Sequence, residues 1–410
     1  MRLKQSPESD FLATDGLKIK DRFIQPDHSF SHMPSLALLS ALAVVPSSAV
    51  VPIPAVQPGR ALLADRAAWG VLRLLGPDAR RFLHQQSTNA FEGIQSGDVR
   101  EAVVTTSAGR MRDLVCAATI APEEILLVCS PGRAPALAAE FDMFIFPADQ
   151  VEVADASSEF CVLSLLGEGA ASSLGSAQLG TPPTSGRCAP LDADGGWALS
   201  GTGLATRGVT LLMRADRAIE MRNALEGLET VVVGPPALYE TYSVLHGRPR
   251  TGLELSKEHN PLEAGLQRAV SFQKGCYIGQ ETIAKLATND GVKQRLCGLR
   301  LSAPLPPHTK LFVDAGEALA GEALAGEAAA RASGVLTGCL ETAENGVLGL
   351  GYVRTRGGFE LCDGLALRTA DGKVEATVYE LPLAPLTPEL DLSKDGAATD
   401  ADAFPVTVSV

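Results

Sequence analysis

Short apolar runs, separated by glycine, proline and charged residues, fill the chain from about residue 59 onward. Up to residue 291 they predict short strands mixed with helices, without the regular βαβ alternation of a parallel sheet, and so indicate an α+β fold. The strands are expected at 99–106, 113–120, 125–130, 151–153, 160–166 and 231–233, and the helices at 79–86, 135–146, 216–228 and 236–245. On the helix at 216–228 the expected core contacts are Ile219, Met221, Leu225 and Leu228.

A second pattern, made of strands alone, begins at about residue 292. Its strands are expected at 294–301, 310–313, 334–336, 347–353, 365–369 and 374–381, with glycine or proline between them. This pattern is typical of a small β-barrel or sandwich. Within it, the segment 315–330 repeats Ala-Gly-Glu three times. Because these repeats are too short for a solenoid, we interpret them as a loop expansion.

The two ends of the chain differ from this globular part. Residues 1–57 contain one mainly apolar run, 36–45, which is too short to cross a bilayer and is followed by Pro46. Acidic residues among the first 30 argue against a plain organelle transit peptide. A targeting extension and a linker or misassigned start both remain open. We therefore predict an extension at 1–57, a globular region at 58–291, a barrel at 292–388 and an acidic tail at 389–410.

Composition narrows the possible functions. Apolar residues make up 46% of the chain, which suffices for buried cores, and the net charge of −13 argues against a protein that coats nucleic acid. The segment between Leu266 and Arg300 contains six basic and two acidic residues. This excess of positive charge could bind a polyglutamate tail or a phosphate; the alternative is a plain solvated surface. The eight cysteines form no CxxC pair, so we expect neither a metal site nor a disulfide framework.

The densest group of chemically useful residues is the segment Phe272-Gln273-Lys274-Gly275-Cys276-Tyr277-Ile278-Gly279-Gln280-Glu281. Its two glycines permit a close backbone approach, and a lysine beside Cys276 would favour the thiolate. Tyr277, Gln280 and Glu281 can hydrogen-bond a polar ligand. The alternative is a glycine-bounded turn into a helix with a buried, inert Cys276. A base for this thiol, His259 or His246, is conceivable, but nothing in the sequence singles out either; we expect His84 to be structural.

The stretch from Lys274 to Glu281 resembles the signature of the YgfZ family, folate-binding paralogues of the glycine-cleavage T-protein. Three further segments are similar to that family: Gly76-Pro77-Asp78-Ala79 with the residues up to Asn89, Phe144 to Asp149, and Asn260 to Leu266. The resemblance implies a ring of two α+β subdomains plus a C-terminal β-barrel, a tetrahydrofolate site in the central hole, and a role in the synthesis or repair of iron–sulfur proteins. Cys276 would be the functional thiol and Lys274 its neighbour. The amino-acid sequence of these segments is most similar to the plastid and cyanobacterial branch of the family. This similarity implies a chloroplast location, with the mitochondrion as the alternative.

Departures from the T-protein pattern bear on the enzyme question. Where the T-protein has paired acids, only Asp113 survives, and Thr206 and Ser243 stand near its charged folate anchors. We expect folate near Asp113, Thr106 and Gly109, with Gly275, Tyr277, Gly279, Gln280 and Glu281 as further contacts. The main hypothesis is an accessory protein, a monomer that meets iron–sulfur clients and no membrane. The alternatives are a folate-dependent aminomethyl or methyl transferase, for which Asp113 would be the acid, and an RNA-linked tRNA-modification module.

Overall fold

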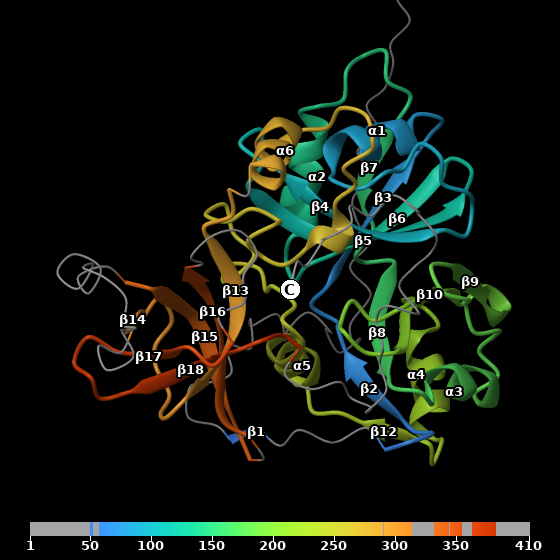
Figure 1. Ribbon diagram of the computed structural model, residues 1–410. Helices are drawn as coiled ribbons and strands as arrows, with labels where there is room; N and C mark the ends of the chain where they lie inside the picture. Colours follow the sequence, from blue (N-terminus) through green and yellow to red (C-terminus); the bar gives the residue numbers. More distant parts are fainter. Residues whose placement is uncertain are drawn as a thin grey trace, which may run out of the picture. The chain divides into compact units, whose positions relative to one another are not determined.

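The computed structural model describes residues 50–51, 57–289, 291–313, 332–343, 345–354 and 363–382 (Figure 1). In this part of the chain the strands form three separate sheets, and the architecture is α+β, as the sequence predicts. The third sheet takes all its strands but one from residues 294–379.

The first sheet has five strands in the order β4-β5-β6-β3-β7, all paired antiparallel. Its strands are β3 (Gly70–Leu75), β4 (Val99–Thr105), β5 (Met111–Ala121), β6 (Glu124–Cys129) and β7 (Glu152–Asp155). Two helices, α1 (Ala79–Gln86) and α2 (Ala134–Asp142), pack on it. Phe82 of α1 meets Phe141 of α2 edge to face, with ring centroids 5.6 Å apart, so the two helices share one core.

The second sheet has six strands in the order β12-β2-β8-β11-β10-β9. They are β2 (Ala61–Asp65), β8 (Phe160–Leu166), β9 (Cys188–Leu191), β10 (Gly196–Ser200), β11 (Gly208–Arg214) and β12 (Val231–Val233). Since β2 precedes the first sheet in the chain and the other strands follow it, the two α+β parts interleave in sequence. The apolar pattern does not predict β2, β3 and β9–β11, because these runs are short or lack alternation.

Two helices, α3 (Ala170–Ser176) and α4 (Ala218–Glu226), cover this second sheet. On α4 the buried face consists of Ala218, Met221 and Leu225, which follow the helical spacing. Ile219 is 68% exposed, so its predicted place in the core is wrong. The reason is phase, because Ile219 lies one residue, about 100°, away from the buried stripe.

The third sheet closes on itself as a barrel. Its order is β15-β14-β17-β18-β13-β16, and β16 pairs back to β15. The strands are β13 (Gln294–Leu301), β14 (Lys310–Val313), β15 (Gly334–Thr342), β16 (Gly346–Arg354), β17 (Ala366–Arg368) and β18 (Glu375–Tyr379). A short strand, β1 (Val50–Val51), adds to β15 in parallel, so the folded part reaches into the extension predicted at 1–57. The insert at 315–330 and the tail at 389–410 lie outside the described residues.

The three sheets meet at helix α5 (Leu238–His246). Tyr239 and Tyr242 of α5 are buried in the core cluster shared by the first and second sheets. Val244 of the same helix lies in another cluster, with Leu114 of the first sheet and Leu350 of the barrel. Burial of such side chains contributes about 1.5–3 kcal/mol each, so α5 fixes the junction from which the functional residues extend.

Candidate functional site

One loop, residues 271–279, carries the sequence motif and lies against the end of α1; we call it the signature loop. The Ser271 amide donates to the Thr88 carbonyl (2.9 Å), and the Ile278 amide donates to the Gln85 carbonyl (3.0 Å). The loop then enters helix α6 (Gln280–Thr288). Both ends of the loop are therefore held by the backbone, and the residues between them have a fixed frame.

Lys274 holds the middle of the signature loop. Its ammonium donates to the carbonyls of His84, Ser87 (2.7 Å) and Asn89 (2.6 Å), at and beyond the end of α1, where helix carbonyls lack partners. Burial lowers the pKa of Lys274 to about 7, and only the protonated form supplies three donors. Because all three are used, the lysine has no donor left for Cys276. Lys274 thus joins the loop to α1, and its predicted effect of favouring the Cys276 thiolate stays a prediction.

Two glycines explain how the loop docks on the β4–β5 hairpin. Gly279 has φ of +87°, and a Cβ there would lie 2.5 Å from the Thr106 carbonyl oxygen and 2.9 Å from the Gly109 Cα. Gly109, at φ +69°, would in turn meet Gly279 and Thr282 at 3.2 Å. The Thr105 hydroxyl closes the contact by donating to the Ile278 carbonyl (2.6 Å). Thr106, Gly109 and Gly279, predicted to bind folate, therefore contact one another.

Cys276 is exposed, and so is Gly275 before it. Among the seven cysteines in the described part of the chain, Cys276 is the only exposed one. Burial raises the pKa of the Cys116 and Cys188 thiols to about 12 and about 11, which keeps them protonated. The alternative of a buried Cys276 is therefore wrong.

The other predicted contacts on this loop separate into buried and solvated residues. Tyr277 is 9% exposed, with the Lys274 Nζ 4.7 Å from its ring centre, and burial raises its pKa to about 12. Gln280 is half-buried at the start of α6. Glu281 pairs with Lys285 one turn later, at 2.5 Å on the exposed face. Of these side chains, Tyr277 is therefore buried, whereas Glu281 faces solvent.

Asp113 lies away from this arrangement, inside β5. It is 0% exposed, and its carboxylate accepts from the amides of Leu114 (2.9 Å) and Ser130 (3.2 Å). Burial raises its pKa, and these hydrogen bonds oppose the rise. The carboxylate that sequence reasoning offered as an acid therefore serves the strand. Thr206 and Ser243, at the positions compared with T-protein anchors, are also buried and donate to the carbonyls of Arg207 (3.3 Å) and Tyr239 (2.8 Å).

His84 of α1 lies next to the signature loop and had been given only a structural role. Its Nδ1 accepts from the backbone amides of Phe91 (3.1 Å) and Glu92 (3.4 Å). Its Nε2 lies 3.7 Å from the position that a Cβ on Gly275 would occupy. No pattern in the sequence predicts this proximity, because His84 and Gly275 lie 191 positions apart. The other two histidines weighed as bases, His246 and His259, stack on Tyr242 and Tyr352 and belong to other packing clusters.

A second polar group lies where the first two sheets meet α5. The guanidinium of Arg66 is 3.8 Å from the Trp69 ring centre and 4.2 Å from that of Tyr239, and it donates to the hydroxyls of Ser164 and Thr210. Within the described residues, Arg66 Nε and Trp69 Nε1 are buried without a hydrogen-bond partner. Burial lowers the pKa of Arg66, which reflects the cost of holding its charge there.

Two more arginines join this group, which we call the arginine junction (Arg66, Trp69, Glu101, Arg248, Arg268). Arg248, buried, donates to the Glu101 carboxylate at 2.7 Å, and Arg268, 57% exposed, donates to it at 3.2 Å. Burial opposes the effect, but Arg268 and Arg248 together hold the pKa of Glu101 below its usual value. Two guanidinium groups thus bind one carboxylate, and Arg66 lies over the same Trp69 ring as Arg248.

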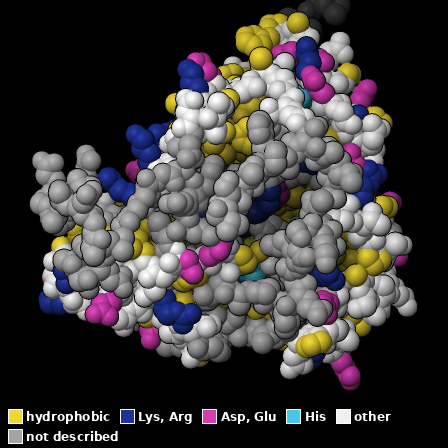
Figure 2. Space-filling model, in the orientation of Figure 1, with side chains coloured by type: hydrophobic (Ala, Val, Ile, Leu, Met, Phe, Trp, Pro, Cys, Tyr) yellow, Lys and Arg dark blue, Asp and Glu magenta, His cyan; other side chains and the backbone are white. Residues whose placement is uncertain are grey.

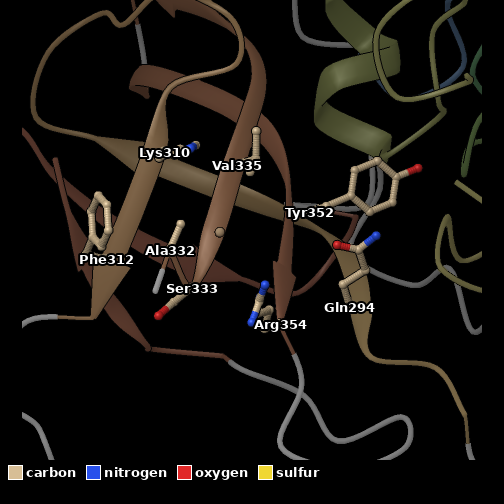
Figure 3. A pocket seen from close by; sticks show the side chains of 9 residues that line it. Gln294, Lys310, Phe312, Ala332, Ser333, Val335, Tyr352 and Arg354 are labelled. Carbon is tan, nitrogen blue, oxygen red and sulfur yellow. The ribbon is translucent and has the colours of Figure 1, made fainter. Parts of the chain in front are cut away.

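A third feature is a cavity of about 380 Å³ on the barrel (Figure 3). Tyr352, Gln294 and Arg354 line one side of it, and Lys310, Phe312 and Val335 line another. The Gln294 amide also reaches His259 Nδ1 and Glu263 at 3.2 Å each, so the segment Asn260–Leu266 supports this wall. None of the predicted site residues lines this cavity. The chemistry expected at Cys276 therefore has no connection to it.

Three of the six basic residues predicted to form a patch between Leu266 and Arg300 are bound to other groups of the protein. Arg268 binds Glu101, Lys274 is buried on carbonyls, and Lys285 pairs with Glu281. Figure 2 shows basic and acidic side chains close together at several places on the visible face. Among the described residues there is no cluster of three or more metal-ligating side chains, and no helix there is long and apolar enough to cross a membrane.

Comparison with known proteins supports the same fold. The chain is 37% identical over 257 residues to a chloroplastic protein of Arabidopsis thaliana, provisionally named a transferase; the match covers 62% of this chain and 59% of the relative. It is 35% identical over 116 residues to the tRNA-modifying protein YgfZ of Vibrio vulnificus, covering 25% and 35%. Aminomethyltransferase T of Bartonella henselae superposes with a TM-score of 0.67 at 20% identity, over 80% of this chain and 87% of that one. No family model matches the chain.

These findings define an α+β protein with the fold of aminomethyltransferase T. The closed barrel and the two interleaved sheets confirm the fold predicted from the sequence. In sequence, parts of the chain are similar to the Arabidopsis protein and to YgfZ. It spans about three fifths and one third of the length of the two curated relatives compared.

Proposed function

We propose that the chain is a folate-binding accessory protein of the chloroplast, which supports the assembly or repair of iron–sulfur proteins through the thiol of Cys276. One observation carries the proposal: Cys276 is exposed on a loop whose two ends and middle are held by hydrogen bonds. A loop fixed in this way keeps a reactive thiol at one place on the surface, where a client protein reaches it. The chloroplast assignment rests on the Arabidopsis relative.

Tetrahydrofolate fits the arginine junction better than the residues first predicted for it. The backbones of Thr106, Gly109 and Gly279 lie in close mutual contact. The junction offers buried N–H groups of Arg66 and Trp69 without partners in the described residues, and the exposed guanidinium of Arg268. Such donors suit a ligand that has hydrogen-bond acceptors on a ring and also carries carboxylates. A pterin with a glutamate tail is a ligand of this kind. When bound, the folate would supply one-carbon chemistry.

A complementation experiment with Cys276→Ser tests the thiol role. In a strain lacking the endogenous homologue, the variant is expected to lose rescue of the iron–sulfur enzymes, because serine keeps the shape but not the nucleophile. Cys161→Ser, in which a partly buried thiol is removed, is the control and retains rescue. Circular dichroism and thermal melting confirm that both variants fold. Full rescue by Cys276→Ser would exclude the thiol function.

Titration with tetrahydrofolate tests the ligand separately. Tryptophan fluorescence reports on the junction, since the chain has two tryptophans and Trp69 is one of them. We expect Trp69→Phe to weaken binding about tenfold through loss of one buried donor, measured by calorimetry. Absence of binding to the unmodified chain would contradict the folate proposal. An aminomethyl-transfer assay with the same folate distinguishes the accessory role from the transferase; the burial of Asp113 leads us to expect no turnover.

A further inference from the structure

The outer face of the barrel is hollowed where β15 begins. Strands β14, β15, β16 and β13 lie side by side in this order. Along β14 and β16, Leu311 and Val353 point into the barrel core, so the residues on either side of each point outward. The cavity of about 380 Å³ lies on this outer face (Figure 3).

The strand register explains why this face is hollow. At the middle of the cavity stand three small residues, Ala332, Ser333 and Gly334, while longer side chains rise from the strands on both sides. Ser333 is fixed between its neighbours, because its amide donates to the Leu311 carbonyl (2.8 Å) and its carbonyl accepts from the Arg354 amide (2.8 Å). The backbone therefore holds a low floor between two walls.

The charges on these walls have one sign. Of the nine residues that line the cavity, Lys310 and Arg354 are charged, and both are basic. Lys310 stands on β14 and Arg354 on β16, on opposite sides of the small residues. In a chain with a net charge of −13, a cavity lined by two cations and no acid favours an anionic ligand.

Two further side chains limit what the anion is attached to. Phe312, half-buried, supplies an apolar ring to the wall that carries Lys310. The Gln294 amide nitrogen is bound to His259 Nδ1 and Glu263, so its amide oxygen is left as an acceptor, and Figure 3 shows this oxygen on the side of Arg354. The lining thus combines cations, a ring and one oriented acceptor, as small-molecule sites do.

We propose that this cavity binds a small organic anion whose carboxylate or phosphate group lies between Lys310 and Arg354 and whose planar ring lies against Phe312. The volume is near the lower end of the range for small-molecule sites, which excludes a large ligand. The inference does not rest on the proposed function, because no lining residue belongs to the signature loop or the arginine junction.

Small probes separate the parts of this ligand. Phenyl phosphate and benzoate carry a ring and an anionic group, benzyl alcohol keeps only the ring, and inorganic phosphate keeps only the charge. Calorimetric titration of the full chain at millimolar concentrations measures each affinity. We expect phenyl phosphate or benzoate to bind at least about tenfold more tightly than either of the incomplete probes, and the tighter of the two identifies the anionic group. Failure of both to bind, or an equal affinity for inorganic phosphate, would overturn the proposal.

Variants of the lining locate the bound probe. Lys310→Gln should weaken its binding about tenfold, and Ser333→Phe, which fills the floor and leaves both charges in place, should abolish it. Lys373→Gln changes an exposed lysine of the same barrel outside the cavity and is the matched control, with unchanged binding. Circular dichroism confirms folding. Unchanged binding in either folded lining variant would overturn the proposal.

Titration of Lys310→Gln with tetrahydrofolate keeps this site apart from the proposed folate site. We expect its folate affinity to equal that of the unmodified chain, because Lys310 is not part of the arginine junction. A loss of folate affinity in this variant would assign the cavity to folate and overturn the proposal of a separate ligand.

Discussion

At the scale of single residues, the motif separates into parts that build the loop and parts that are left for chemistry. Lys274, Tyr277 and Gly279 are engaged by α1, by burial and by the β4–β5 hairpin. Phe272, Gln273, Gly275 and Cys276 are exposed, and of these four residues only Cys276 carries a nucleophile. Most of the motif's buried residues therefore hold the loop in place, and its reactive group is one exposed thiol.

Replacing Gly279 by alanine tests the docking part. The new Cβ would lie 2.5 Å from a backbone carbonyl oxygen, at a φ that alanine avoids. We expect a loss of at least about 2 kcal/mol in the free energy of unfolding, measured by urea denaturation. Gly275→Ala, at the other glycine of the motif, should change this free energy by less than about 0.5 kcal/mol. Equal losses in the two variants would contradict the different roles assigned to the two glycines.

At the scale of elements, the functional loop depends on strands and helices far apart in the sequence. The end of α1, the β4–β5 hairpin and the start of α6 meet around it. Glu101 of β4 likewise joins Arg248, which follows α5, and Arg268, which precedes the loop. These contacts between elements fix the position of the signature loop.

Arg248 and Arg268 bind the same carboxylate, but Arg248 is buried and Arg268 is exposed. Replacing each in turn therefore separates the effect of burial on stability from the effect of charge. Arg248→Gln leaves Glu101 without its buried partner, and we expect a loss of about 3 kcal/mol in unfolding free energy. Arg268→Gln removes an exposed partner and should cost at most about 1 kcal/mol. Calorimetric melting of both variants measures the difference. If Arg268→Gln destabilised the chain as much as Arg248→Gln, Glu101 would not be the buried anchor described here.

The sequence predicted elements better than it predicted contacts. Strands such as β5 and β16 were found because their apolar runs are long, and α4 was found but with Ile219 on the wrong face, since one residue of helical phase is enough to expose it. The burial of Asp113 and the proximity of His84 to Gly275 could not be predicted. Both depend on which segments the tertiary fold brings together, and that information is spread over the whole chain.

At the scale of the whole molecule, three sheets share one junction, and buried ionisable groups concentrate around it. His246, at the end of α5, stacks on Tyr242 and is 8% exposed. Burial lowers the pKa of its imidazole to about 4, and the same cause lowers that of His259 to about 4. Both rings are neutral in the folded state at pH values where the unfolded chain would protonate them.

The junction should therefore make the stability of the chain sensitive to acid. Between pH 6.5 and about 4 the unfolded state binds more protons at His246 than the folded state, so stability falls as the pH falls through this window. For one histidine the full effect is about 3 kcal/mol. The free energy of unfolding of His246→Leu, measured by chemical denaturation at a series of pH values, should therefore fall by about 3 kcal/mol less over this window than that of the unmodified chain. His308→Asn, which changes an exposed histidine, is the control and keeps the original slope. If the unfolding free energy of His246→Leu depended on pH as in the unmodified chain, the His246 ring would be protonated in the folded state. Water would then reach this end of α5.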